Sequence, residues 1–196
     1  MIAYIKGKLV QKDPTHVIIE CNGIGYQIQI SLNTYGEIKD REDICLQTIQ
    51  IIREDAHLLY GFGSPNEKFM FQQLISVNGI GPGTAIMALS SLPPEELRSA
   101  IIAESVSTLQ AIKGIGAKTA QRLILELKDK LRKDQSDVIN LPGSAPHNSI
   151  RSEALSALIT LGISRVAAEK TIDSILKKSG NNLSLEDLVK IALKNA

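Results

Sequence analysis

The sequence has little of the chemistry from which metal sites and disulfide frameworks are made. Among its 196 residues there is no tryptophan, and there are only two cysteines and three histidines. Cys21 and Cys45 form no CxxC pair, and only His16 and His57 lie near them in sequence, so neither a zinc site nor a disulfide framework is indicated. We expect no metal, no cofactor and the reducing setting of the cytoplasm.

An excess of charge and a long apolar run are missing too. The 22 basic residues nearly cancel the 21 acidic ones, so the overall charge predicts neither a nucleic-acid binder nor an acidic-surface protein, and any charge signal must be local. No stretch approaches the length of a membrane span. The start, MIAYIKGKLV, alternates and carries two lysines, unlike a signal peptide, which predicts a soluble, unexported protein.

The first 63 residues contain the pattern of a small β barrel. In the run GYQIQIS, residues 25–31, apolar and polar side chains alternate as they do on a strand with one buried face. Asn22-Gly23, just before this run, predicts a type I′ hairpin turn. Four similar runs are 3–10, 16–21, 45–52 and 57–62. Five short strands fit a closed barrel of the OB type, by analogy of architecture alone.

Between the last two of these runs, the sequence REDAH places three charged residues, Arg53, Glu54 and Asp55, in a predicted hairpin tip. Charges in such a turn usually do no more than keep the edge of a sheet soluble. On this stretch alone we interpret the tip as a solvated turn.

From residue 64 to 133 the periodicity is helical, and one phrase occurs twice. VNGIGPGTA at 77–85 returns as IKGIGAKTA at 112–120, each time between two apolar-periodic helices, which predicts two helix-hairpin-helix motifs. A dinucleotide fingerprint would need a strand before its glycines. A Walker A loop would need glycine where Ala117 and Ile112 stand, so GAKT only mimics a phosphate loop.

The repeated Gly-Ile-Gly has a physical use. Glycine adopts positive φ without strain and lets a ligand approach the backbone, while amides at the start of the following helix point outward and the helix dipole adds partial positive charge. The two bends therefore suit phosphate, with Ile80 and Ile115 turned inward. A lone bend would as readily be a helix C-cap, but two copies can hold two phosphates of a duplex without reading its bases.

Positive charge gathers at the second copy. Seven basic and two acidic residues lie between Lys113 and Lys133. Helical spacing leaves Lys118 and Arg122 outside near the helix start, where a phosphate would lie. The first copy has Gly83 where the second has Lys118, so it would depend more on its amides.

The residues predicted to form the packed face of the helix after the second bend are Ala120, Leu123, Ile124, Leu127 and Leu131. In the helix before the first bend, the residues predicted to be core rather than a stacking platform are Phe69, Met70 and Phe71.

The last part of the chain is predicted to be a tethered helical module. Residues 134–148 contain proline, glycine and serine without sustained periodicity, which is typical of a flexible linker. Ser164 and Ser184 are candidate N-caps, and Asp187 follows Ser184 as in a capping box. The helical runs are 152–161, 165–178 and 185–194. A small bundle on a tether, with no evident catalytic group, suits gripping a partner that moves.

The order of these parts, with the two bends, REDAHLLYGF and ALITLGIS, closely resembles the RuvA family of Holliday-junction-binding subunits over the whole length. The resemblance implies a multidomain α+β fold with four parts. These are a five-stranded OB-like β barrel (1–63), a central all-α tandem helix-hairpin-helix domain (64–133), a flexible linker (134–148) and a C-terminal three-helix UBA-like bundle (149–196). It also implies a homotetramer, or an octamer, that binds four-way junction DNA without sequence preference and holds it open. The implied partners are the hexameric ATPase RuvB and the resolvase RuvC, in DNA recombination, DNA repair and the SOS response.

The same resemblance implies roles for single residues. Glu54 and Asp55 match an acidic pin that repels phosphates at the crossover, which replaces the solvated-turn interpretation. The residues that match the contact region for RuvB, which carries the ATP hydrolysis, are Leu158, Leu161 and Ile163. The implied DNA contacts are Gly79, Gly81, Lys113, Gly114, Gly116, Lys118, Thr119 and Arg122. Gly83 departs from the basic residue expected in the family at that position.

Two other classes of function use parts of this pattern. A nuclease, glycosylase or ligase can carry helix-hairpin-helix motifs, but the sequence offers no clustered carboxylate pair, no lysine nucleophile in a recognisable motif and no nucleotide loop. A pure interaction scaffold would leave the basic run unexplained. Junction binding measured against salt separates these classes, because phosphate contacts predict an affinity that falls steeply with ionic strength.

Overall fold

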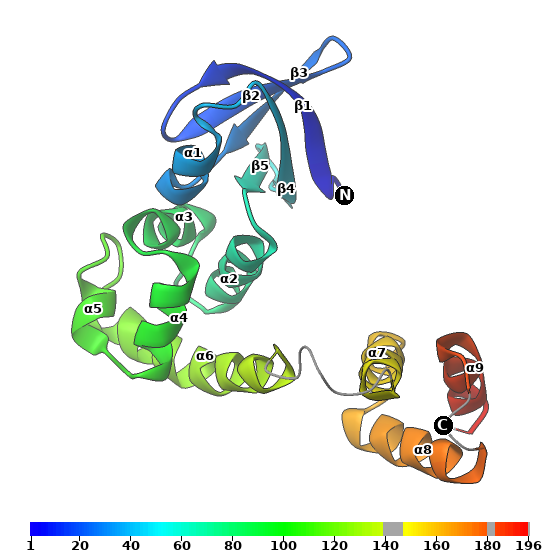
Figure 1. The fold of residues 1–196 in the computed structure, drawn as a ribbon. Helices are drawn as coiled ribbons and strands as arrows, with labels where there is room; N and C mark the ends of the chain where they lie inside the picture. The colour runs from blue at the N-terminus through cyan, green and yellow to red at the C-terminus, as the bar shows by residue number, and fades with distance from the viewer. Residues whose placement is uncertain (139–146, 180–182, 196) are drawn as a thin grey trace. The chain divides into compact units, whose positions relative to one another are not determined.

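The computed structural model describes residues 1–138, 147–179 and 183–195 (Figure 1). It divides into two compact units, 1–136 and 137–196. The linker expected at 134–148 is helical at both of its ends, up to Val138 and from His147. Its middle, 139–146, lies outside the described residues.

The first unit begins with a closed five-stranded barrel, as the alternation predicts. The strands follow one another around it in the order β1, β2, β3, β5, β4, and all pairs are antiparallel except β3 with β5. Asn22 and Gly23 join β2 to β3 with φ of 50° and 84°, which confirms the type I′ turn. The bounds are β1 (Tyr4–Lys12), β2 (His16–Cys21), β3 (Ile24–Gln29), β4 (Asp43–Ile52) and β5 (His57–Phe62).

A short helix, α1 (Leu32–Ile38), lies between β3 and β4 and is absent from the sequence prediction. The Ser31 hydroxyl caps it by accepting a hydrogen bond from the Thr34 amide at 3.0 Å. The Asn33 side-chain amide donates to the carbonyl oxygens of Leu89 and Leu92, far along the chain. Seven residues are too few to hold a helix in water, so contacts of this kind stabilise it.

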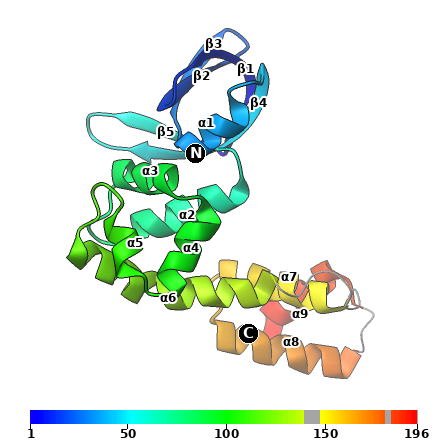
Figure 2. The same ribbon diagram turned by 60° about the vertical axis from the view of Figure 1, so that its left-hand side comes forward.

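Five helices follow the barrel, where the periodicity from residue 64 onward predicts helical structure. Figures 1 and 2 show α2 and α3 between the barrel and α6. A proline stands in the first turn of α2, α3 and α4, where its missing N–H costs no helical hydrogen bond. The bounds are α2 (Pro65–Ser76), α3 (Pro82–Ser91), α4 (Pro94–Ile102), α5 (Val106–Gln110) and α6 (Ala117–Val138).

The interior of the barrel forms a core of its own, while the end of β5 belongs to the core of these helices. Phe71 of α2 packs against Tyr60 and Phe62 of β5, with ring centroids 5.1 and 4.9 Å apart. Met70 and Phe71 are buried, and Phe69 packs partly buried against the same cluster, which confirms that they are core. The end of the barrel and the start of the helical part are therefore held together by apolar contact.

A buried carboxylate also joins the two parts. Glu67, at the start of α2, is only 2% exposed. It accepts hydrogen bonds from the hydroxyls of Ser31 and Thr34 and from the Gly63 amide at 3.3 Å. Burial raises the pKa of Glu67, and the hydrogen bonds to the charged form offset part of that rise. This one side chain links α1, the residue after β5 and α2.

The second unit is a bundle of three helices, as the sequence predicts. Gly162, with φ of 94°, ends α7, and the Ile163 amide donates to the Leu158 carbonyl at 3.0 Å in the pattern of a Schellman cap. The Ser184 hydroxyl accepts from the Asp187 amide at 3.2 Å and donates to its carboxylate at 2.8 Å, which confirms the capping pair. The bounds are α7 (His147–Thr160), α8 (Arg165–Ser179) and α9 (Leu185–Asn195).

Candidate nucleic-acid interface

The repeated phrase in the sequence is a repeated bend in the structure. Gly79 and Gly114 have φ of 96° and 93°. The amides of Ile80 and Ile115 each donate to the carbonyl three residues back, both at 3.1 Å, and both isoleucine side chains are buried. Positive φ at these places requires glycine, because a Cβ would be strained there. The two bends therefore have the same backbone geometry, and each is fastened to its own helix pair by an isoleucine.

A helix begins at the second glycine of each bend. The amides of Ala85 and Ala120 donate back to the carbonyls of Gly81 and Gly116, at 3.0 and 2.9 Å. The amides of the first turn before these positions have no intrahelical acceptor, as at any helix start, and the macrodipole adds partial positive charge. In α3 one of them is removed by Pro82. Such an arrangement is suited to a phosphate oxygen.

The second glycine of each bend is not required by the fold. Gly81 has φ −84° and ψ 167°, which any residue adopts, and Gly116 is not among the positive-φ positions. A Cβ built on either glycine meets nothing within 4 Å. Nothing within the described chain therefore fills the space in front of Gly81 and Gly116. Glycine at such a place leaves the backbone bare toward a ligand.

The two bends are neighbours and contact each other. Arg122 of α6 donates from Nη1 to the Asn78 carbonyl, in the first bend, at 3.1 Å. A Cβ built on Gly114, in the second bend, would lie 3.4 Å from the Thr84 methyl at the start of α3. Sequence reasoning placed Arg122 correctly on the outer side of its helix but missed Asn78 and Thr84. No signal of spacing could have found a contact between residues 44 positions apart.

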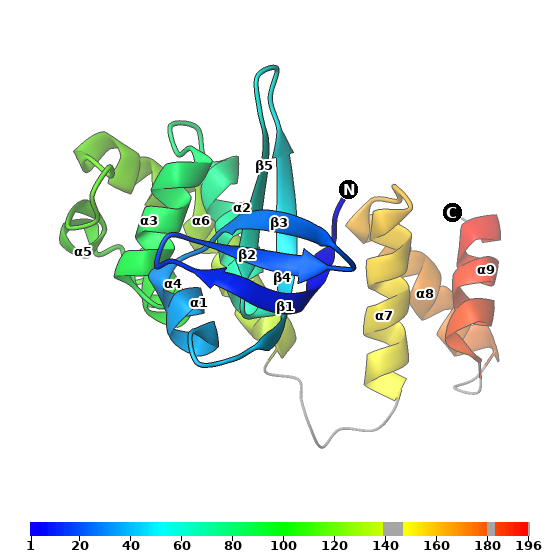
Figure 3. The same ribbon diagram turned by 90° about the horizontal axis from the view of Figure 1, so that it is seen from above.

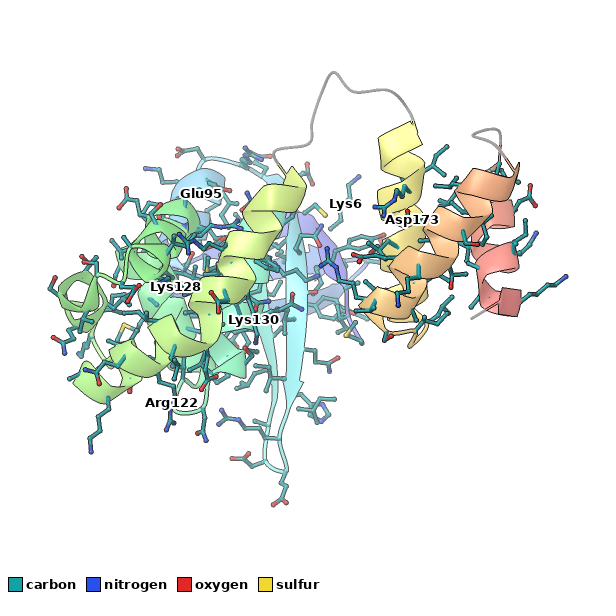
Figure 4. All side chains as sticks on the ribbon, turned by 90° about the horizontal axis from the view of Figure 1, so that it is seen from below. Lys6, Glu95, Arg122, Lys128, Lys130 and Asp173 are labelled. Atoms are coloured by element: carbon teal, nitrogen blue, oxygen red, sulfur yellow. The ribbon has the colours of Figure 1, made fainter. Side chains whose placement is uncertain are left out.

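The remaining basic and hydroxyl candidates surround the second bend. Lys113 and Lys118 are exposed, and Thr119 is half-buried. Figure 4 shows Arg122, Lys128 and Lys130 along α6, with Arg122 nearest the helix start. Lys128 pairs with Glu104 and lowers the pKa of that carboxyl through a hydrogen bond and its charge. Lys128 therefore already has an acidic partner within the chain. The predicted packed face is confirmed by the burial of Ala120, Leu123, Ile124, Leu127 and Leu131.

The charged tip lies at the end of a long β hairpin. β4 and β5 pair in register up to Ile52 and His57, and the Arg53 amide donates to the Ala56 carbonyl at 2.8 Å. Figure 3 shows this hairpin standing clear of the rest of the barrel. Glu54 and Asp55, at its tip, are exposed. The geometry presents two carboxylates away from the barrel, at a point where the fold makes no use of them.

The three predicted partner-contact residues of the second unit differ in their exposure to solvent. Leu158 is fully buried in the bundle core, because it lies on the face of α7 that packs against the other two helices. Leu161 is 60% exposed, and Ile163 is half-buried. Sequence reasoning missed Ile159 and Val166, which are 41% and 64% exposed and flank the same turn. The apolar surface of this turn, Ile159, Leu161, Ile163 and Val166, is here called the turn patch.

Metal-type clusters and membrane-spanning helices are both absent from the described part of the chain. Among residues 1–138, 147–179 and 183–195, no three His, Cys, Asp or Glu side chains come together as metal ligands would. Over those same ranges, no helix combines the length and the apolar character that crossing a membrane requires.

Three models of known protein families match parts of the chain. Residues 1–61 match the RuvA N-terminal domain, 71–129 the SAM-like helix-hairpin-helix tandem, and 149–196 the RuvA C-terminal domain. A curated protein of Cytophaga hutchinsonii is 55% identical over 201 residues, covering 99% of each chain. The chain belongs to the RuvA family. A member in Christiangramia forsetii is 48% identical, and the match covers 99% of each chain. A member in Amoebophilus asiaticus is 49% identical, and the match covers 99% of this chain and 100% of the relative. All three are named Holliday junction branch migration complex subunit RuvA.

Proposed function

We propose that this chain binds four-way DNA junctions through its two bends, without reading base sequence, as the DNA-binding subunit of a branch-migration complex. The observation that carries the proposal is the pair of open glycines, Gly81 and Gly116, since a Cβ on either would meet nothing within 4 Å and each stands at the start of a helix. The names of the RuvA-family members, similar over their whole length, support the junction as the ligand. No catalytic step is assigned to the chain itself.

The grip on DNA follows from the chemistry of the bends. Backbone amides and the positive end of a helix contact a phosphate oxygen, and every nucleotide carries the same phosphate, so such contacts position DNA without specifying sequence. At the second bend, Lys113, Lys118 and Thr119 add charge and a hydroxyl around the amides. Two bends in contact with each other would hold two phosphates at one fixed spacing, which suits a duplex arm.

Four copies of the chain would suit a four-way junction, with one pair of bends for each arm. In such a homotetramer the four β4–β5 tips would meet at the crossover, and the carboxylates of Glu54 and Asp55 would repel phosphates there. A continuous duplex laid across the centre would suffer the same repulsion, so the pin would favour a junction by penalising its competitor. The open centre would keep the strands apart for migration.

The second unit suits a role in recruiting the motor. We assign the turn patch to contact with the ATPase RuvB, with Leu158 supporting it from the core beneath. Exposed apolar groups gathered around one turn are typical of a protein-binding surface. ATP hydrolysis belongs to that partner, and the resolvase RuvC would act on the same junction in recombination and DNA repair.

The test is a band-shift comparison of four-way, three-way and linear DNA of equal length, repeated at several salt concentrations. The proposal expects the four-way junction to bind most tightly and all affinities to fall steeply with salt, with a slope of about −0.9 for each phosphate contact. Two junctions of unrelated sequence serve as the control and should bind equally. Equal affinity for linear and four-way DNA, or affinity independent of salt, would overturn the proposal.

A further inference from the structure

The first bend lacks a cation of its own. Where the second motif carries Lys118, the first carries Gly83, and the nine residues from Val77 to Ala85 include no basic residue at all. Amides and a helix dipole alone make a weaker phosphate site than amides with a full charge beside them, because hydrogen bonds from charged donors are about twice as strong as neutral ones. A positive charge supplied from elsewhere in the fold would therefore strengthen the first bend as a phosphate site.

The structure brings one cation to the first bend from the second motif. Arg122 lies one turn into α6, and its Nη1 donates to the Asn78 carbonyl at 3.1 Å. Its Nε lies 4.0 Å from a Glu126 carboxylate oxygen, a distant pairing on an exposed helix face. A guanidinium has five N–H donors, and within the described part of the chain only these two groups engage it. The side chain is 50% exposed, so its other donors face solvent beside the first bend.

We propose that Arg122 serves the first bend: its guanidinium fixes the Asn78 carbonyl and offers its free donors to the phosphate that the first bend holds. The inference rests on the proposed function and goes further, because it reassigns a cation of the second motif to the first. Arginine suits this double task, since its planar fork can hold one acceptor and present donors to another. Lysine at the same place would have a single charged group for both tasks.

The position of the Asn78 carbonyl explains why this contact orders the bend. The carbonyl belongs to the peptide that precedes Gly79, and Gly79 is the residue with φ of 96°. A hydrogen bond to that peptide restrains the turn from outside, while the Ile80 amide bond to Val77 at 3.1 Å restrains it from inside. Without Arg122 the outer restraint is lost, and the bend should open more often.

The first experiment uses the free protein without DNA. Amide hydrogen exchange is measured at Ile80 and its neighbours in the wild type, in Arg122→Ala and in the matched control Lys118→Ala. We expect exchange of the Ile80 amide to become faster in Arg122→Ala and to stay unchanged in Lys118→Ala. A residue that only contacts phosphate would leave exchange unchanged in both variants, and that result would overturn the inference.

The second experiment restores the missing cation. Gly83 lies outside the positive-φ region and a Cβ there meets nothing within 4 Å, so Gly83→Lys fits the fold. In the Arg122→Ala background it should raise the salt slope of junction binding by about 0.9 per chain, because a phosphate contact is regained. In the wild type and in Lys118→Ala it should add little, since Arg122 already holds that phosphate. An equal gain in all three backgrounds would overturn the inference. Failure of the wild type to prefer junctions would instead overturn the proposed function.

Discussion

Alanine at the second glycine of both bends should destroy tight junction binding and leave the fold almost untouched. The variant is Gly81→Ala with Gly116→Ala. Both positions accept a Cβ, since neither has positive φ and nothing lies within 4 Å of the built atom. The two glycines should therefore matter only when DNA is present.

The effect on stability is a balance of two small terms. Alanine restricts the unfolded chain and stabilises the fold by about 0.4–1 kcal/mol where the backbone conformation allows it. At a helix N-cap alanine is less favourable than glycine by roughly the same amount. The two terms offset each other, so the free energy of unfolding should change by less than about 1 kcal/mol.

The first glycine of each bend provides the matched control. Gly79 and Gly114 have φ of 96° and 93°, where alanine costs roughly 1–2 kcal/mol per residue. At Gly114 the new methyl would also lie 3.4 Å from Thr84. Gly79→Ala with Gly114→Ala should therefore lower the free energy of unfolding by about 2–4 kcal/mol. Alanine at Gly79 and Gly114 is thus expected to change the stability of the fold, whereas alanine at Gly81 and Gly116 is expected to change the binding of DNA.

The weaker binding follows from the hydrogen bonds that the new methyl blocks. A hydrogen bond between an amide and a charged phosphate contributes about 1.5–3 kcal/mol. Removing one such hydrogen bond at each bend corresponds to a roughly 10- to 150-fold weaker affinity per bend. Urea unfolding and fluorescence anisotropy with a labelled four-way junction measure the two quantities. A stable Gly81→Ala, Gly116→Ala variant that binds the junction like the wild type would refute the reasoning.

Three further predictions concern other parts of the chain. Glu54→Gln with Asp55→Asn should keep the fold and raise affinity for linear duplex relative to the junction in band-shift assays; an unchanged preference would exclude the pin. Burial raises the pKa of Glu67, so the stability it contributes is full below its ordinary value of 4.5 and is lost as pH rises through the raised value. Glu67→Gln should remove this pH-dependent part from urea unfolding curves, whereas an identical pH profile would contradict the assignment. Leu161→Ala should weaken RuvB binding in a pull-down with little change in stability, while Leu158→Ala should destabilise the bundle by about 2–5 kcal/mol; the reverse order would show that the turn patch is misassigned.

The repeat of the bends was predictable because it depends on local chemistry. Gly-Ile-Gly between two apolar-periodic helices fixes a positive φ, an inward isoleucine and a helix start within a few residues, and both copies have these features. The barrel was predictable for a similar reason, since alternation and the Asn22-Gly23 turn act over neighbouring residues. Local patterns decide local structure, and these features are local.

Features that depend on distant contacts could not be predicted. α1 is a seven-residue helix with Gly36 inside it, and its stability comes from Asn33 bonding to carbonyls more than fifty residues away. Periodicity showed that Arg122 is on the outer side of α6 but not that it reaches Asn78. For Leu158, the family resemblance pointed to a partner contact, while the packing of three helices buries its side chain.

The cluster shared by β5 and the helices connects the charged hairpin to the bends. The β4–β5 hairpin carries Glu54 and Asp55 at one end, and at the other end Tyr60 and Phe62 pack on Phe71 of α2, the helix that leads directly into the first bend. In the proposed tetramer, repulsion at the crossover would be coupled to the hold on an arm only if the barrel and the helices did not move independently. Closely packed buried rings such as Tyr60, Phe62 and Phe71 restrict independent movement of β5 and α2. The aromatic contacts at Phe71 thus connect the base of the hairpin that carries Glu54 and Asp55 to the helix that precedes the first bend.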